Sequence, residues 1–260
     1  MLKHKSALIT GSTSGIGLGI ARAFAEQGAR IMLNGFGDAA AIERTRDELA
    51  AKTGAEVRYH GADMSRPEAV MALVAATEAA FGGVDILVNN AGVQCVAPVE
   101  EFPPEQWERI RAIVLDASFH ATRAVLPGMK QRNWGRILNL VSVHGLVASP
   151  FKSAYVAAKH GQIGLTRTVA LELAETGITC NAICPGYVRT PLVEGQIEAQ
   201  AVAHGLPRER VIREVILAAQ PSKRFVEVEE IAALALFLCG DAARSITGAA
   251  IPVDGGWTAR

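Results

Sequence analysis

The amino-acid sequence predicts an α/β fold, in which one doubly wound parallel sheet of seven strands has helices on both faces. Short apolar runs alternate with longer helical patterns along the chain, which is typical of parallel strands joined by right-handed crossovers. Half of the 260 residues are apolar, enough for a sheet that is covered on both faces. A chain of this length fits one domain, so we expect residues 1–260 to form a single unit.

The predicted strands are the short apolar runs, and the predicted helices are the longer segments between them. In chain order, the strands cover residues 7–10, 30–33, 56–60, 86–88, 135–141, 178–183 and 250–253. The helices cover residues 15–27, 39–52, 66–80, 104–131, 153–175 and 228–238. Residues 189–224 depart from this alternation, because they are polar and only partly helical. Ligands of such sheets bind beyond the carboxyl ends of the strands, where we expect the functional residues.

A glycine-rich turn, Gly11-Ser-Thr-Ser-Gly15-Ile-Gly17, joins the first predicted strand to the first predicted helix. Glycines there let the backbone approach a ligand closely, and the free N–H groups of a helix N-terminus favour phosphate. The spacing differs from the usual Gly-x-Gly-x-x-Gly of dinucleotide sites, and a plain tight turn would also explain the glycines. Their position between strand and helix favours a dinucleotide site.

Tyr155 and Lys159 are four residues apart, so on a helix they share one face, about 6 Å apart along the axis. A phenol has a pKa of about 10, too high for ready proton exchange at neutral pH, and a neighbouring ammonium lowers it. Ser142 ends the apolar run 136–142, where its hydroxyl can reach the same substrate oxygen as Tyr155. A Tyr-x-x-x-Lys pair alone is more often a solvated helix face.

Together these features resemble the short-chain dehydrogenase/reductase family, and the resemblance covers nearly the whole chain. The motifs that fall in the family's order and spacing are Thr10-Gly11-x-x-x-Gly15-x-Gly17, Asp63, Asn89-Asn90-Ala91-Gly92, Ser142, Tyr155-x-x-x-Lys159 and Pro185-Gly186. The resemblance implies a Rossmann-type fold, a bound nicotinamide dinucleotide, and hydride transfer between it and an alcohol or ketone. It implies that Ser142, Tyr155 and Lys159 are catalytic, with Tyr155 as the base, and that residues 189–224 form a lid over a small substrate.

The resemblance also implies which residues contact the dinucleotide. Asp63 and Met64 would contact the adenine, Asn90 and Ala91 the adenosine ribose, and Lys159 the nicotinamide ribose. Val188 and Thr190 would hold the carboxamide. The full set is Gly11, Thr13, Ser14, Gly15, Ile16, Gly17, Phe36, Asp63, Met64, Asn90, Ala91, Gly92, Tyr155, Lys159, Pro185, Gly186, Val188 and Thr190.

The segment Leu33-Asn34-Gly35-Phe36-Gly37, at the end of the second predicted strand, bears on the choice between NAD and NADP. Neither this segment nor residues 12–14 contain the Arg or Lys that a 2′-phosphate usually needs. The acidic residue that commonly contacts the ribose in NAD sites is also missing. Because a phosphate without a partner is costly, the absence of a cation favours NAD.

Polar residues around the predicted trio suggest the kind of substrate. Lys152 supplies one cation, and neutral polar groups come from Gln94, His144 and Gln196, a set that suits a small carboxylate. The set, with Trp257, resembles family members that act on a short hydroxy acid. This resemblance implies that the four polar residues hold the carboxylate, that Ser142 and Tyr155 contact the reacting oxygen, and that Trp257 lies near the methyl end. Alternatively, Lys152 and Gln196 are solvated, and Trp257 is a core or subunit-interface anchor.

Val114 departs from the family pattern, which has Asn at this position of the long helix. In the family that Asn helps to hold a water that connects the lysine to solvent, and valine cannot form hydrogen bonds. Asp116 points to another side of the helix and cannot replace it. Three explanations remain: a water held by backbone groups alone, a slow enzyme, or a non-catalytic binder. If the relay needs the amide, Val114→Asn should raise turnover.

Charge and cysteine content exclude other classes of function. The net charge is zero, so nothing suggests nucleic acid or an anionic membrane as a partner. The four cysteines lack redox or zinc spacing, and no metal site is expected. Without a signal peptide or a run of 18 apolar residues, a cytoplasmic location is expected. The resemblance implies a homotetramer formed by residues 104–131, 153–175 and the C-terminal strand. The alternatives are a ketoreductase of fatty-acid or sugar metabolism, or a non-catalytic dinucleotide-sensing protein.

Overall fold

The structure is a computed structural model that describes residues 1–259, apart from the side chains of residues 192, 199, 203 and 204. Seven strands form one sheet in the order β3-β2-β1-β4-β5-β6-β7, and all neighbouring pairs are parallel. The strands are β1 (Ser6–Ile9), β2 (Arg30–Asn34), β3 (Val57–His60), β4 (Ile86–Asn89), β5 (Gly135–Leu140), β6 (Ile178–Pro185) and β7 (Ala250–Val253). The predicted seven-stranded parallel sheet is confirmed.

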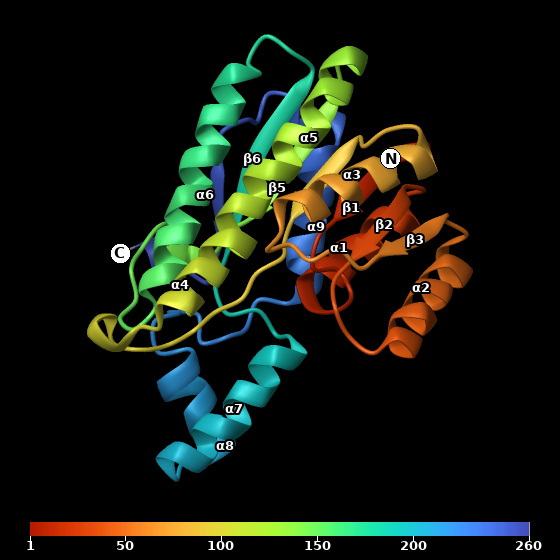
Figure 1. The fold of residues 1–260 in the computed structure, drawn as a ribbon. Coiled ribbons are helices and arrows are strands. Elements are labelled where there is room, and N and C mark those ends of the chain that lie inside the picture. The colour runs from red at the N-terminus through yellow and green to blue at the C-terminus, as the bar shows by residue number, and fades with distance from the viewer. Residues whose placement is uncertain (260) are drawn as a thin grey trace.

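Helices cover both faces of this sheet (Figure 1). Helices α1, α2 and α9 pack on one face, whereas α3, α5 and α6 pack on the other. The helices are α1 (Gly15–Glu26), α2 (Ala39–Thr53), α3 (Pro67–Phe81), α4 (Pro104–Arg111), α5 (Ala117–Arg132), α6 (Ser153–Glu172), α7 (Pro191–His204), α8 (Arg208–Arg210) and α9 (Val228–Cys239). Local signals set their ends: for example, Asp38 accepts a hydrogen bond from Ala41 N before α2, and Gly54 ends α2 with a left-handed φ of 70°.

Most residues of the central strands are apolar, because side chains on both faces of the sheet are buried. In β1, Ile9 packs with α1 and α9, whereas its neighbour Leu8 packs on the α3 and α5 side. Both residues are fully buried. This two-sided burial explains why the strands appear in the sequence as continuous apolar runs rather than as alternating patterns.

The long helix predicted over residues 104–131 is interrupted in the structure. Helix α4 continues into a π-helical turn, Ala112–Asp116, before α5 begins. The N–H of Ala117 donates to Ala112 O, five residues earlier, which widens the helix at this point. The prediction of one regular helix was therefore wrong at Val114.

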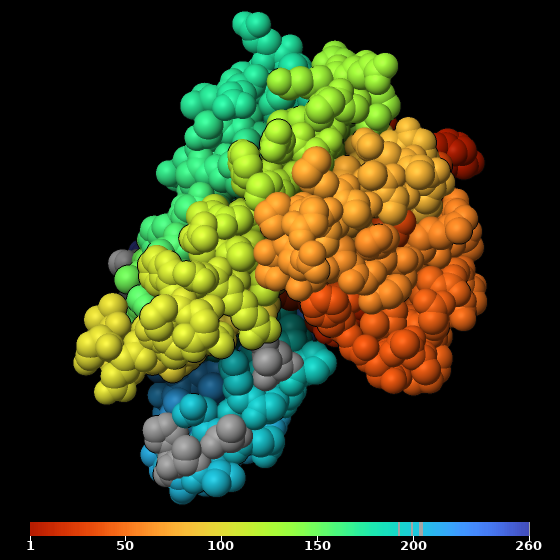
Figure 2. Space-filling model, in the orientation of Figure 1, coloured from red at the N-terminus to blue at the C-terminus, as the bar shows by residue number. Residues whose placement is uncertain are grey.

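Between β6 and α9, the chain forms a small subdomain with its own apolar cluster. It contains α7, α8 and a second π-helical turn, Val211–Ile216. Its buried centre consists of Ile197, Val211, Ile216, Leu217 and Phe225. Figure 2 shows this cyan and blue segment projecting from the body, with a recess between it and the orange N-terminal half. The polar, partly helical character predicted for residues 189–224 agrees with this arrangement.

Candidate active site

The glycine turn after β1 combines backbone conformations and close contacts that favour glycine. Gly11 and Gly15 have φ angles of 61° and 56°, in the left-handed region. A Cβ on Gly17 would lie 2.5 Å from Asn90 Nδ2, so a side chain there would clash. Asn90 Nδ2 donates to Thr10 O at 2.9 Å and to Gly11 O at 2.8 Å. The Asn90 amide nitrogen therefore holds the turn in shape.

The N-terminus of α1 opens onto this turn without a side-chain cap. Ser14 occupies the N-cap position but makes no capping hydrogen bond, and the first turn has no acidic residue. Its free N–H groups and positive dipole end suit a phosphate. Thr190, which follows β6, lies across the turn, with its methyl carbon 3.7 Å from where a Cβ of Gly15 would be. These observations fit the pyrophosphate of a dinucleotide.

At the end of β2, the Asn34 side chain is fully buried, and its hydrogen bonds join neighbouring loops of the fold. Its Oδ1 accepts from Gly11 N, and its Nδ2 donates to His60 O and Ala62 O. Phe36 is 67% exposed, and its backbone oxygen accepts from Thr13 Oγ1. Asn34 is therefore unavailable to an adenosine ribose.

Asp63 and Met64 follow β3. The Asp63 carboxylate accepts from Ser65 N and Ser65 Oγ, and these hydrogen bonds lower the pKa of Asp63. Met64 is buried beside it. Both residues lie in the loop that follows the carboxyl end of their strand, as expected for the adenine end of the site.

The predicted catalytic residues lie together where β5 ends and α6 begins. Tyr155 and Lys159 occupy successive turns of α6, and Lys159 Nζ lies 5.6 Å from the centre of the Tyr155 ring. Ser142 follows β5 and hydrogen-bonds the Tyr155 hydroxyl, which works to lower the pKa of Tyr155. Lys159 Nζ donates to Leu140 O at 2.6 Å and to Gln162 Oε1 at 2.9 Å. The expected grouping of the three side chains is present.

The pKa of Tyr155 corrects one expectation. Burial raises it to about 12 because a phenolate is poorly solvated there, and the Ser142 hydrogen bond offsets only part of this effect. Burial also lowers the pKa of Lys159 to about 7. A lysine that is partly neutral at neutral pH cannot by itself lower the pKa of the phenol, so the expected direction was wrong for the protein without a dinucleotide.

His144, Trp257 and Tyr187 form an aromatic cluster beside Tyr155. The His144 ring meets the Tyr155 and Trp257 rings edge-on, with centroid distances of 6.3 and 5.4 Å. Tyr187 stacks on Trp257 at 5.9 Å. Burial, with a smaller contribution from the Lys152 charge, lowers the pKa of His144 to about 4, so its imidazole is neutral. A backbone contact with Val147 works in the opposite direction but does not offset the burial.

The remaining predicted substrate residues come from three separate segments. Lys152 immediately precedes α6 and is partly buried, which lowers its pKa. Gln94 is exposed in the segment after β4, and Gln196 lies on α7, partly exposed. The roles of the two glutamines stay predictions.

The segment after β6 connects the sheet to the subdomain that contains α7 and α8. Pro185 ends β6, and Gly186 packs so closely that a Cβ would lie 3.1 Å from Asp254 Cα. Val188 is buried and pairs with Val226, and Thr190 Oγ1 accepts from Val193 N at the start of α7. The Thr190 side chain is thus already a helix cap.

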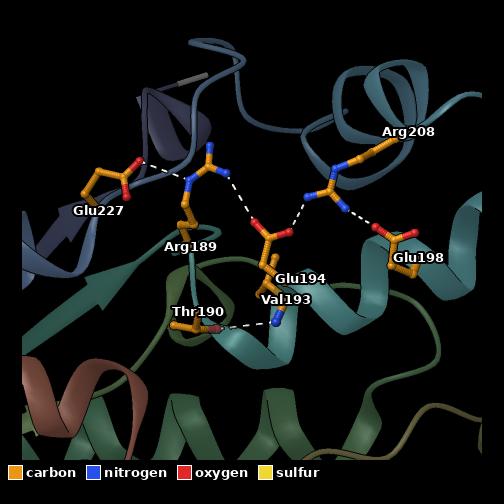
Figure 3. A network of polar contacts seen from close by, with 7 residues as sticks. All are labelled: Arg189, Thr190, Val193, Glu194, Glu198, Arg208 and Glu227. Atoms are coloured by element: carbon orange, nitrogen blue, oxygen red, sulfur yellow. Dashed lines mark hydrogen bonds and ion pairs between the residues drawn. The ribbon is translucent and has the colours of Figure 1, made fainter.

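Ion pairs connect this subdomain to the body (Figure 3). Arg189 contacts Glu227 at 3.3 Å, beside the start of α9, and Glu194 of α7 at 3.2 Å. Arg208 of α8 pairs with Glu194 and Glu198. The chain of charges therefore runs from Glu227, just before α9, through Arg189 to α7 and α8.

Val114 is fully buried in an apolar cluster with Ile110, Ala154 and Ala158, against which Tyr155 packs. Asp116 pairs with Arg111 at 2.7 Å on the partly exposed side of the helix. Asp116 therefore does not replace the missing asparagine, as predicted.

Three residues of the site were not singled out from the sequence: Tyr187, Gln162 and Ser118. Tyr187 could have been found, because it directly follows Pro185-Gly186. Gln162 is three residues after Lys159 and faces the same side of α6. Ser118 carried no signal, because its distance from Lys159 in sequence hides the contact between α5 and α6.

Among the described residues, no group of three or more His, Cys, Asp or Glu side chains could hold a metal ion. In the described part of the chain, no helix is long and apolar enough to span a bilayer.

Comparison with known proteins gives close relatives. The family model described as enoyl-(acyl carrier protein) reductase matches residues 11–258. A D-beta-hydroxybutyrate dehydrogenase of Rhizobium meliloti (strain 1021) is 58% identical, covering 98% of this chain and 99% of the relative. One from Cupriavidus necator is 57% identical over the full length of both chains. The crystal structure of L-sorbose reductase from Gluconobacter frateurii, complexed with NADPH and L-sorbose, has a TM-score of 0.93 at 32% identity, covering 98% of this chain and 97% of that one.

Proposed function

The chain belongs to the short-chain dehydrogenase/reductase family, and we propose that it interconverts D-3-hydroxybutyrate and acetoacetate with NAD as the cofactor. The observation that carries the proposal is the Ser142–Tyr155–Lys159 group, beside a cluster that contains His144 and Trp257. Relatives named D-beta-hydroxybutyrate dehydrogenase, at 57–58% identity over essentially the whole chain, support this substrate.

Each member of the trio has a defined task in this reaction. Ser142 Oγ hydrogen-bonds the oxygen on C3 of the substrate, and Tyr155 as phenolate removes the proton of that hydroxyl. Lys159 stabilises the phenolate from one helical turn away. The dinucleotide, when bound, accepts the hydride, and its oxidised ring adds positive charge that favours the phenolate. In the reverse direction, Tyr155 returns the proton.

The substrate carboxylate is proposed to bind near Lys152 and His144. Lys152 immediately precedes α6, which has no side-chain cap, so free N–H groups there also favour an anion. The neutral imidazole of His144 lies beside Tyr155 and would hydrogen-bond the substrate. Gln94 and Gln196 would complete the carboxylate site, and Trp257 would contact the methyl end.

NAD is proposed over NADP because the adenosine end offers no cation to a 2′-phosphate. No Arg or Lys occurs among residues 12–14 or 33–37, and the Asn34 side chain is already bonded to the fold. A phosphate there would lose hydration without gaining an ionic partner.

Five further features are proposed with this function. Residues 1–260 would act as one domain, residues 189–224 would close over the substrate, and the enzyme would be a cytoplasmic homotetramer. Ketone-body metabolism would be its context. Exposed Phe119 on α5 and Leu171 on α6 are compatible with subunit contacts on these helices.

The test is NADH formation from D- and L-3-hydroxybutyrate, each with NAD and with NADP. We expect turnover with the D-enantiomer and NAD. Reduction of a sugar or carrier-bound ketone in preference to acetoacetate would favour the ketoreductase alternative. Tight dinucleotide binding without turnover of any hydroxy or keto acid would favour the non-catalytic dinucleotide sensor.

A further inference from the structure

A buried chain of hydrogen bonds links the ammonium of Lys159 to the π-helical turn at Val114. Lys159 Nζ donates to Gln162 Oε1 at 2.9 Å, and Gln162 Nε2 donates to Ser118 Oγ at 2.8 Å. Ser118 Oγ in turn donates to Val114 O at 2.8 Å. The three side chains are 1–3% exposed, so water does not compete freely for these bonds.

The direction of this chain is fixed by its last acceptor. The Val114 carbonyl can only accept, so it takes the single proton of the Ser118 hydroxyl. Ser118 Oγ must then accept from Gln162, which requires the NH₂ side of the amide to face Ser118. The amide oxygen of Gln162 consequently faces Lys159, where an oxygen favours the charged amine.

Gln162 is itself held from a second side. Thr166 Oγ1 donates to the Gln162 backbone oxygen at 2.7 Å, and Asn139 Nδ2 donates to Thr166 Oγ1 at 2.8 Å. Lys159 also donates to Leu140 O, so two of its three N–H bonds are directed away from Tyr155 by fixed acceptors. The third remains for the reacting side of the site.

We propose that Gln162, oriented by Ser118, is a positioning residue that keeps Lys159 charged and directed for its work on Tyr155. This side-chain pair would take over the support of the lysine that the family resemblance assigns to an asparagine at position 114. The inference rests on the proposed function, because it concerns the proton transfer of that reaction.

Few other ionisable groups face Lys159. Tyr155 lies on the same helix as Lys159, and Cys184 faces Lys159 from β6. The charge of Asp254 also acts on the Cys184 thiol. Burial raises the pKa of Cys184 to about 11, so the thiol is neutral in the working range. From the long crossover helix, Ser118 and Val114 contact this region, and neither titrates. Gln162 is therefore well placed to influence the charge of Lys159.

The main test compares Gln162→Leu with Gln162→Glu in hydride transfer as a function of pH. In the leucine variant, kcat should fall about 10- to 100-fold, as expected for losing a hydrogen bond to a charged group. The rising limb of its pH profile should move to higher pH, because less ammonium faces the phenol. NAD affinity should remain near that of the wild type. The glutamate variant keeps an acceptor for Lys159 and should recover most of the turnover.

A second readout follows the charge of Lys159 without catalysis. Carbon-13 NMR of the lysine Cε groups should show one lysine with a pKa of about 7, assigned by its loss in Lys159→Met. Gln162→Leu should lower that pKa, and Ser118→Ala should lower it by less. Thr77→Val is a matched control, because Thr77 Oγ1 is a buried hydroxyl that donates to Leu73 O four residues earlier, far from the site.

Wild-type turnover and an unchanged pH profile in a folded Gln162→Leu protein would overturn the inference. Equal losses in the leucine and glutamate variants, with the Lys159 pKa unmoved, would also overturn it, since they indicate a purely structural role. If Gln162→Leu does not fold, Ser118→Ala tests the inference instead, by the pH profile of kcat and by the Lys159 pKa. A Lys159 pKa shift in a protein that oxidises no hydroxy acid would support the inference and refute the proposed function.

Discussion

Tyr187 stacks on Trp257, with the ring centroids 5.9 Å apart and the ring planes inclined by 20°. Trp257 lies near the C-terminus, in the short turn Trp257–Ala259, and Tyr187 lies between β6 and α7. The stack therefore joins the C-terminal turn to the segment that leads into α7. The His144 ring meets the Trp257 ring edge-on. The rings of Tyr187, Trp257 and His144 therefore form one wall beside Tyr155.

Removing the stack should weaken substrate binding more than chemistry. An aromatic pair contributes about 0.5–1.5 kcal/mol beyond its buried area, so Tyr187→Ala should raise KM for 3-hydroxybutyrate about 2- to 10-fold. Steady-state kinetics measure this, with the exposed Phe237→Ala on α9 as the control. If KM stays at the wild-type value, Trp257 does not depend on Tyr187 for its position.

The buried, neutral His144 should make the protein lose stability in acid. Its pKa in the folded protein is about 4, below the ordinary value of 6.5, so the unfolded chain binds a proton first as the pH falls. Between pH 6.5 and 4 this residue should lower the free energy of unfolding by up to about 3 kcal/mol. Urea unfolding across that range should show a shallower loss in His144→Gln than in the wild type. Equal slopes in the two proteins would contradict the assignment.

Val114→Asn should destabilise the protein and leave turnover unimproved. Its side chain would enter the fully buried cluster of Ile110, Ala154 and Ala158, where an amide without a partner costs about 1–3 kcal/mol. The burial of Val114 and the contact between Lys159 and Gln162 thus reverse the expectation drawn from the sequence alone. Thermal unfolding and kcat together test this prediction. A variant with higher kcat and unchanged stability would contradict it and support a proton relay that needs asparagine.

The lid ion pairs should influence substrate capture modestly. Arg208→Ala removes the pairs with Glu194 and Glu198, and because these pairs are exposed to solvent, the loss should be small. We expect KM to rise about 2- to 5-fold with kcat nearly unchanged, and added salt should reduce the difference. Arg58→Ala, which breaks an exposed pair with Glu56 at β3, is the control. A large fall in kcat instead would mean that the network positions catalytic groups.

Most of the fold followed from the sequence because its signals are local and repeated. Each buried strand is a short apolar run, and the predicted strands 250–253 and 135–141 differ from β7 and β5 by at most one residue. The π-helical turn at 112–116 was missed because a single wider turn hardly changes the apolar spacing. Strand β6 also runs to Pro185, two residues beyond the prediction, because Pro185 pairs with Val253.

The candidate site was less predictable where it depends on burial and on contacts between distant segments. The Tyr155-x-x-x-Lys159 spacing correctly placed both side chains on one face of α6. The sequence did not show how deeply they are buried, and burial reverses the expected direction of the Tyr155 pKa. Likewise, the contact between Gln162 and Ser118 joins residues 44 positions apart, which no local pattern reveals.

The measurement that bears most directly on the central claim compares wild type and Tyr155→Phe in NADH formation from D-3-hydroxybutyrate with NAD. The variant keeps the ring and its packing but lacks the oxygen that exchanges the proton. We predict a loss in kcat of about 10²- to 10⁴-fold, with NAD affinity near the wild-type value. Wild-type turnover in this variant would contradict the assignment of Tyr155 as the base.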